Sequence, residues 1–486
     1  MTRRAVGGIA GAAGLIAVLT LLSRVAGFGR TLVFADSVRA SGIGDVYNAV
    51  NAVPNVVHEV AAGGALAALT VPLIAAHLGA GGRREAHAVA STLLTWALLV
   101  LVPLGALVWA LAEPITGLLV GTSVEGGVET GATMLRIFAL QVPLYGIGVV
   151  LSGVLHAHQR FGAVAIAPLL SSLVVIATYA AYGSIAQGET MDVPADAVAL
   201  LAWGTTAGVA ALALPLVVPV WRTGWRFRPG LRFPGDDAAR ARRLAGAGLL
   251  ALAAQQAAVV VTVRLAVSRG GGEGALSVYT WIQAVVMLPY AVLVVPLATA
   301  AFPALAARTA DAAVTSPGGT DEGGRLLGRA FHIAVLLGVA GAAALLVTSP
   351  LVGAGFGFLD ARRGEGVASG AAVPAMAAGL RAFAPGVLGF GVQALLTRAL
   401  YVRGRPVTAG LAVATGWVVA VAIPAAALAD DAGAARTVVL LGVGWSVGMT
   451  LAAGLLLGLA VRHWGYGLLR GWGETLGYLA RTVRGR

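Results

Sequence analysis

The chain has 486 residues, of which 58% are hydrophobic and only 11% charged, and its mean hydropathy is +0.87. Soluble domains carry about 25% charged residues, so this composition excludes a soluble globular protein and indicates a polytopic membrane protein. The absence of Cys excludes disulfides and thiolate chemistry. The net charge of +12 could suggest a nucleic-acid partner. The arginines are concentrated in short loops, however, so we expect no nucleic acid.

Apolar stretches of about 20 residues or more predict the transmembrane helices. In chain order the first six lie at about 8–35, 46–78, 86–120, 130–156, 163–187 and 195–220. The second six lie at about 244–267, 275–306, 329–355, 372–401, 407–428 and 436–460. The sequence therefore predicts an all-α protein of about 12 transmembrane helices in two six-helix lobes. The expected division is a first lobe at 1–221, an Arg-rich linker at 222–243, a second lobe at 244–463 and an amphipathic tail at 464–486.

The loop charges predict the orientation. If the N-terminus lies inside, the Arg-rich loops share its side, whereas the opposite loops are poor in Arg and often acidic, as at Glu125, Glu129 and Glu273. Only Arg362 and Arg363 deviate from this pattern. The positive-inside rule thus predicts that both termini, the linker and the tail are cytoplasmic. We expect that residues 1–22 are not a signal peptide, because no convincing cleavage site precedes the charged segment Ser23–Arg30 that follows.

Two arginines lie within the first predicted span. Arg24 and Arg30 are six residues apart, in a segment where each charge would cost roughly 2.5–3.5 kcal/mol near the bilayer centre. An anchoring helix gains nothing from them, so we expect this helix to face an aqueous cavity that an anionic group enters. Gly27, between them, is consistent with close helix packing or with a hinge.

The second predicted span has a polar stripe. Asp45, Asn48, Asn51, Asn55 and His58 fall within roughly 140° of helical arc, the pattern of a face turned towards the bundle or a wet cavity. The alternative is that these side chains only join helices together. A structural His58 beside Glu59 is as plausible as a proton-linked one. Pro54 removes a backbone hydrogen bond and is a candidate hinge.

Further candidate buried cations are Arg264 in the seventh span, Arg136 in the fourth, and Arg381 and Arg398 in the tenth. Arg264 is the best placed by depth. No nucleotide-binding loop, metal-ligand spacing or Ser/His/Asp arrangement is visible, so we expect no cofactor, no metal and no enzymatic activity.

The two halves resemble each other. Val53-Pro54-Asn55 in the second span corresponds to Leu288-Pro289-Tyr290 in the eighth, and the fourth and tenth spans both end in basic residues. Parallel repeats of this kind form transporters that bind substrate between the halves, although chance similarity of apolar helices is the alternative.

Several segments together resemble the MurJ (MviN) lipid II flippases, of the multidrug/oligosaccharidyl-lipid/polysaccharide exporter superfamily. These segments are Ser23–Arg30, Asp45, Val53–Asn55, Gly63–Pro72, Leu155–Phe161 with Ala167–Pro168, Leu288–Tyr290 and Arg398–Pro406. The resemblance implies a two-lobed transporter of the bacterial cell membrane with a central cavity. It would move undecaprenyl-pyrophosphate-linked peptidoglycan precursor to the outer leaflet by alternating access. Arg24, Arg30 and Asp45 match cavity positions of the family, and the arginines would bind the pyrophosphate.

The sequence also departs from the family. A basic residue often found in the second span is replaced by His58 and Glu59, and an Arg of the eighth span by Ala284, for which Arg264 is a candidate substitute. Many members have two further C-terminal helices, where this sequence has residues 464–486. The alternatives are export of another polyprenyl-linked glycan or amphipathic molecule, or a transport-inactive scaffold that recruits cell-wall synthesis proteins through its linker and tail.

Overall fold

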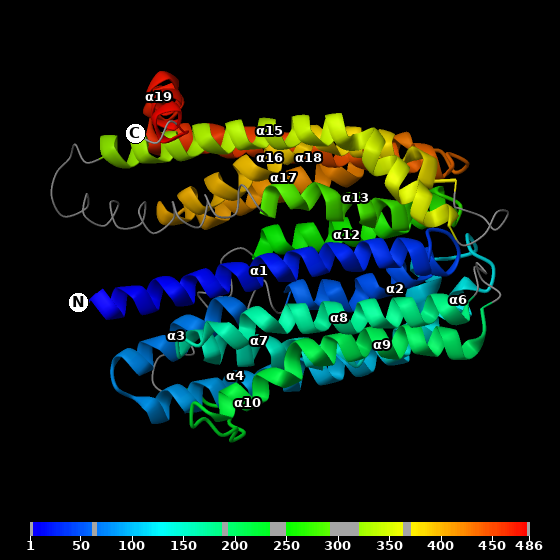
Figure 1. Cartoon of the computed structure of the whole chain (residues 1–486), viewed down its shortest axis with the longest axis horizontal. Coiled ribbons are helices and arrows are strands. Elements are labelled where there is room, and N and C mark those ends of the chain that lie inside the picture. The colour runs from blue at the N-terminus through cyan, green and yellow to red at the C-terminus, as the bar shows by residue number, and fades with distance from the viewer. Residues whose placement is uncertain are drawn as a thin grey trace. The chain divides into compact units, whose positions relative to one another are not determined.

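The computed structural model describes residues 3–60, 66–186, 193–233, 249–291, 320–362 and 371–483, and all regular structure in these ranges is helical (Figure 1). The all-α prediction is confirmed. Ten helices in these ranges are long and apolar enough to cross a membrane. The second and eighth predicted spans are the exceptions. The described part of the second forms two helices, Ile43–His58 and Ala67–Gly79, and that of the eighth forms the shorter apolar helix Ala275–Pro289. The motif Gly63-Gly64-Ala65 lies outside the described residues.

The chain forms two compact units. Unit 1 comprises Met1–Leu249, Gly271–Ser277 and Phe356–Ala371, and unit 2 comprises Leu250–Gly270, Val278–Gly355 and Ala372–Arg486. The sequence predicted a simple division into halves with a linker between them. The structure differs, because two segments from the second half of the sequence belong to unit 1.

Unit 1 is built on long apolar helices that pack side by side. Helix α1 lies along α8, α8 packs on α9, and α4 packs on α3 and α7. The helices are α1 (Arg3–Ser37), α2 (Ile43–His58), α3 (Ala67–Gly79), α4 (Arg83–Ala110), α5 (Ala112–Leu119), α6 (Gly127–Phe138), α7 (Gln141–Ala157), α8 (Phe161–Ile185), α9 (Ala195–Ala213), the short η2 (Leu214–Leu216) and α10 (Val217–Trp221).

An aromatic and hydroxyl cluster is buried in unit 1. The Tyr47 hydroxyl lies 2.8 Å from the Tyr179 hydroxyl and 3.0 Å from Thr205 Oγ1. Phe34 and Phe138 pack around the Tyr47 ring. Buried hydroxyls are costly unless they are paired, so this network fixes α1, α2, α8 and α9 together.

Unit 2 contains α12 (Leu249–Arg269) from Leu250 onwards, most of α13 (Ala275–Pro289) and α15 (Thr320–Ala361), and the whole C-terminal part of the chain. That part consists of η4 (Val373–Ala375), α16 (Met376–Val402), α17 (Pro406–Ala427), α18 (Ala434–Trp464), η5 (Tyr466–Leu469) and α19 (Trp472–Val483). Helix α18 packs on both α16 and α17. Glycines allow the close approach, since a Cβ at Gly448 would overlap the carbonyl oxygen of Gly416.

The repeat suggested by the sequence has a structural counterpart inside each unit. Helix α9 packs on α7 and α8, just as α18 packs on α16 and α17. In addition, α2 and α13 both run into wider π-type turns, at residues 59–60 and 290–291. The equivalent helices therefore pack and end alike.

The tail of unit 2 folds onto its own helices. The Trp472 ring stacks on His332 with 4.0 Å between centroids, Thr475 Oγ1 lies 3.1 Å from His332 Nδ1, and Arg403 lies 4.0 Å from the Trp464 ring centroid. In Figure 1, α19 runs across the direction of α15. The predicted amphipathic tail is thus a docked helix.

Candidate functional site

The two arginines of α1 lie on an exposed part of unit 1. Both Arg24 and Arg30 have exposed side chains, although they lie in the candidate span Val18–Ser37. Within the described part of the chain, neither forms an ion pair with an acidic side chain. Ser23 fixes this part of α1, because its hydroxyl donates to Leu19 O at 2.8 Å and to Ala165 O of α8 at 3.2 Å. The helix is therefore anchored on one side while its two cations remain available on another.

Gly27 does not lie in a close helix contact. A Cβ built at this position would meet no atom within 4 Å. The expectation of close packing at Gly27 is therefore wrong, and α1 is one uninterrupted helix from Arg3 to Ser37. The role of Gly27 as a hinge stays a prediction.

The polar stripe of α2 divides into two parts. At the C-terminal end, Asn55 Oδ1 accepts a hydrogen bond from the Tyr145 hydroxyl at 3.1 Å, and the His58 ring lies 4.2 Å from the Tyr145 ring. Arg30 is close enough for its charge to act on the Tyr145 hydroxyl. His58 Nδ1 is buried without a hydrogen-bond partner among the described residues. This end of α2 thus groups neutral polar side chains within reach of the charges of both Arg30 and Glu59, with Pro54 buried in the turn before Asn55.

At the other end of the stripe, Asp45 is fully buried and holds the first turn of α13. Its two carboxylate oxygens accept hydrogen bonds from Gly274 N at 3.0 Å, Ser277 N at 2.9 Å and Ser277 Oγ at 2.9 Å. Asn48 Nδ2 donates to the same Ser277 hydroxyl at 3.1 Å. A carboxylate at a helix N-terminus satisfies free amides and complements the helix dipole. In this conformation, Asp45 and Asn48 form a helix cap, which differs from the predicted substrate-binding role.

A buried ion pair lies in the same unit. Arg39 Nε is 3.7 Å from Asp360 Oδ1, and the two side chains are 4% and 0% exposed. Arg39 has a φ of 74°, which is rare for a residue with a side chain. Sequence reasoning missed this pair. A signal was present, since Arg39 is a further arginine on the predicted outer side, and the loop-charge pattern above counted only Arg362 and Arg363 as deviations.

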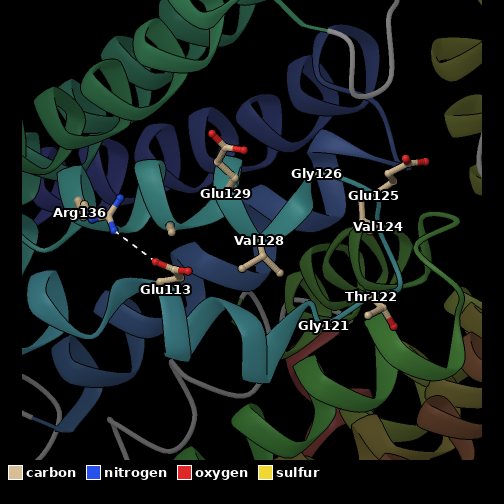
Figure 2. A pocket seen from close by; sticks show the side chains of 10 residues that line it. Glu113, Gly121, Thr122, Val124, Glu125, Gly126, Val128, Glu129 and Arg136 are labelled. Carbon is tan, nitrogen blue, oxygen red and sulfur yellow. Dashed lines mark ion pairs between the residues drawn. The ribbon is translucent and has the colours of Figure 1, made fainter.

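A cavity of about 750 Å³ lies at another part of unit 1 (Figure 2). Arg136 lies 4.0 Å from Glu113 across it, and Glu125 and Glu129 also line it. Three carboxylates against one guanidinium make this cavity unfavourable for an anion. Arg136 is therefore paired with an acidic side chain, in contrast to its interpretation as a candidate cation for substrate.

In unit 2, Arg264 lies on α12 with its Nη1 atom buried and without a hydrogen-bond partner among the described residues. The other two candidates are engaged locally: Arg381 Nε donates to Ser349 Oγ at 3.0 Å, and Arg398 Nη1 donates to Ala394 O at 2.9 Å. Among the three, Arg264 is the one with a buried guanidinium nitrogen that has no hydrogen-bond partner in the described part of the chain. It lies on the first helix of the second repeat, as Arg24 and Arg30 lie on the first helix of the first.

Comparison with solved structures shows the fold. A lipid II flippase MurJ in an inward closed conformation superposes with a TM-score of 0.68 at 14% identity, covering 94% of this chain and 90% of that one. An inward-facing multidrug resistance transporter of the MATE family and MOP superfamily superposes with a TM-score of 0.67 at 15% identity, covering 96% and 99%.

Sequence comparison shows the family. The lipid II flippase MurJ of Burkholderia cenocepacia is 28% identical over 304 residues, which cover 60% of this chain and 56% of the relative. The probable lipid II flippase MurJ of Rhizobium meliloti is 28% identical over 346 residues, covering 68% and 60%. The matches thus span less than two thirds of these relatives' own length. The family model described as "Lipid II flippase MurJ" matches residues 34–483. The chain therefore belongs to the MurJ family and is a multi-pass protein of the bacterial cell membrane.

Proposed function

We propose that this protein moves a lipid-linked pyrophosphate, the peptidoglycan precursor lipid II, from the inner to the outer leaflet by alternating access. The family match and the names of the relatives support this substrate. The single observation that carries the proposal is the presence of two exposed arginines, without acidic partners among the described residues, on a helix long and apolar enough to span the membrane.

Lipid would be unfavourable surroundings for these side chains. Two arginines near the bilayer centre would together cost roughly 5–7 kcal/mol, from about 2.5–3.5 each. A water-filled path removes that cost. A pyrophosphate offers charged oxygens to which each guanidinium can donate two parallel hydrogen bonds, stronger than neutral ones. Arg24 and Arg30 are therefore assigned to the pyrophosphate.

The remaining candidates receive supporting roles in this proposal. Arg264, with its unsatisfied nitrogen, supplies the cation of unit 2. Asn55 and His58 offer neutral polar contacts close to Arg30, and Pro54 and Gly27 are the positions where the helices bend. Asp45 holds α13 in unit 1, close to the residue where the chain passes to unit 2.

Complementation tests the proposal. Wild type and Arg30→Ala are expressed in a strain depleted of its own lipid II flippase, with Arg160→Ala as the matched control, since Arg160 is another exposed arginine of unit 1. We expect wild type and Arg160→Ala to restore growth and Arg30→Ala to fail at equal membrane abundance. Failure of the wild type would exclude lipid II as substrate and favour another polyprenyl-linked glycan.

The same variants separate transport from scaffolding. A scaffold for cell-wall synthesis proteins would tolerate Arg24→Ala and Arg30→Ala but lose function when the Arg-rich linker is changed. A transporter would show the opposite order. In vesicles, fluorescent lipid II should become accessible to a membrane-impermeant quencher with wild type and several-fold more slowly with Arg30→Ala.

A further inference from the structure

The Arg-rich segment after α10 is not a free linker over its first twelve residues. Residues 222–233, which we call the strap, lie against α4 and form the green loop that follows α10 in Figure 1. Trp225 anchors the strap, since its side chain is 2% exposed and belongs to the hydrophobic core of unit 1. The remaining residues of the predicted linker, 234–243, lie outside the described part of the chain.

Polar side chains of α4 hold the backbone of the strap. Ser91, Thr92, Thr95 and Trp96 lie on one face of this apolar helix, since they form two adjacent pairs separated by one helical turn. The hydrogen bonds are Trp225 Nε1 to His87 O and Ser91 Oγ (both 3.1 Å), Arg228 N to Ser91 Oγ (3.3 Å), Gly230 N to Thr95 Oγ1 (3.2 Å), Thr92 Oγ1 to Arg232 O (3.1 Å) and Trp96 Nε1 to Leu231 O (3.1 Å). The path of the strap is therefore fixed by the hydrogen bonds to its backbone and by the burial of Trp225 in the core.

The outer surface of the strap is basic and aromatic. All four of its arginines are exposed and it contains no acidic residue; they are Arg222, Arg226, Arg228 and Arg232. Large apolar side chains are exposed among them: Trp221 (55%), Phe227 (40%), Leu231 (58%) and Trp96 (45%). Tryptophan beside clustered arginines at the end of a membrane helix is the composition of a membrane–water interface.

We propose that the strap is a binding surface for anionic phospholipid headgroups. Its arginines complement the headgroup phosphates, and the exposed aromatic and aliphatic side chains reach the level of the glycerol and upper acyl chain. The positive-inside rule alone requires only that the loop carries positive charge, and a loop without a fixed path would meet that requirement. Here hydrogen bonds from α4 fix the backbone of the strap. The guanidinium groups are therefore held near their binding positions before lipid binds, and less conformational entropy is lost on binding.

Lipid titration tests this inference independently of transport. The full-length protein in a neutral detergent is titrated with dioleoyl phosphatidylglycerol or, as the neutral probe, dioleoyl phosphatidylcholine, and bound lipid is counted by native mass spectrometry. The test variant is Arg222→Gln/Arg228→Gln/Arg232→Gln. Arg226 is retained because its Nη1 donates to Trp221 O and Trp225 O. The matched control removes the same charge from other exposed arginines of unit 1, two at the start of α4 and one just before α8, Arg83→Gln/Arg84→Gln/Arg160→Gln.

We expect the strap variant to bind phosphatidylglycerol at least about tenfold more weakly and the control less than about twofold, with equal unfolding midpoints. Equal losses in both variants would overturn the proposal, because charge alone would then explain binding. No preference of wild type for phosphatidylglycerol over phosphatidylcholine would also overturn it and leave the surface to an acidic protein partner.

A second variant tests the placement of the strap with all arginines kept. Thr92→Val/Thr95→Val removes two of the hydroxyls that hold its backbone while preserving side-chain shape. We expect several-fold weaker binding of phosphatidylglycerol. Unchanged affinity would contradict the claim that α4 positions the arginines.

Discussion

Removing one partner of the ion pair between Arg39 and Asp360 should be one of the most destabilising single changes of charge in unit 1. At 3.7 Å and an effective dielectric constant of about 20, the attraction is about 4–5 kcal/mol. Removing one partner leaves the other charge buried without its ion-pair partner, which costs about 3–5 kcal/mol. We therefore expect Arg39→Gln and Asp360→Asn each to lower the free energy of unfolding by that amount. The double variant should lose much less than the sum.

The measurement is a double-mutant cycle on purified protein, unfolded by a denaturing detergent titrated into a mild one. The control cycle uses Arg136 and Glu113, which lie 4.0 Å apart but are 42% and 74% exposed. That pair should couple by less than about 1 kcal/mol. A coupling energy below about 0.5 kcal/mol for Arg39 and Asp360 would refute the reasoning, because burial would then not strengthen the pair.

Three further predictions follow from the contacts in each unit. Asp45→Asn should lower the free energy of unfolding by about 1–2 kcal/mol, because an amide can accept only part of the hydrogen bonds that cap α13, and native-state proteolysis near Ser277 should become faster. Gly27→Ala should raise the free energy of unfolding by up to about 1 kcal/mol, because the added Cβ meets no atom within 4 Å and alanine favours the helix. Unchanged transport by this variant would exclude a hinge at Gly27. Gly448→Ala should destabilise unit 2 by about 1–3 kcal/mol in the same assay, through overlap with Gly416, and equal stability would show that α17 and α18 separate freely.

The fold was largely predictable from the sequence because hydropathy and loop charge are local signals. Long apolar runs predict α4, α8 and α17 directly, and the repeat predicted that the two units pack alike. The second helix of each repeat was predicted less well. In the first repeat, the predicted span at 46–78 continues past His58, where α2 ends in the structure. Hydropathy averaged over a window does not detect the end of a helix when the residues on both sides of it are apolar.

The candidate site was predictable only in part. A charge in an apolar run is visible from sequence alone, so Arg24 and Arg30 could be selected as candidates, and their role in substrate binding stays a proposal. Whether a polar residue faces a cavity or caps another helix depends on contacts far away in the chain. Asp45 meets Ser277 at a separation of 232 residues, and no local pattern predicts such a partner. Arg39 and Asp360 are likewise far apart in the sequence. The strap also contacts a distant helix, α4, whereas its Arg-rich composition alone suggested a simple linker.

The division of the chain has a consequence for biosynthesis. Unit 1 is completed by residues 271–277 and 356–371, which are synthesised long after its first six spans. At roughly 5–20 residues per second, the 232 residues between Asp45 and Ser277 take roughly 10–50 seconds to translate. During that interval the carboxylate of Asp45 and the guanidinium of Arg39 have no partner from these segments. We therefore expect a nascent chain stopped before residue 271 to be a preferred substrate for membrane chaperones and proteases, and a split gene to work only when both fragments are made together.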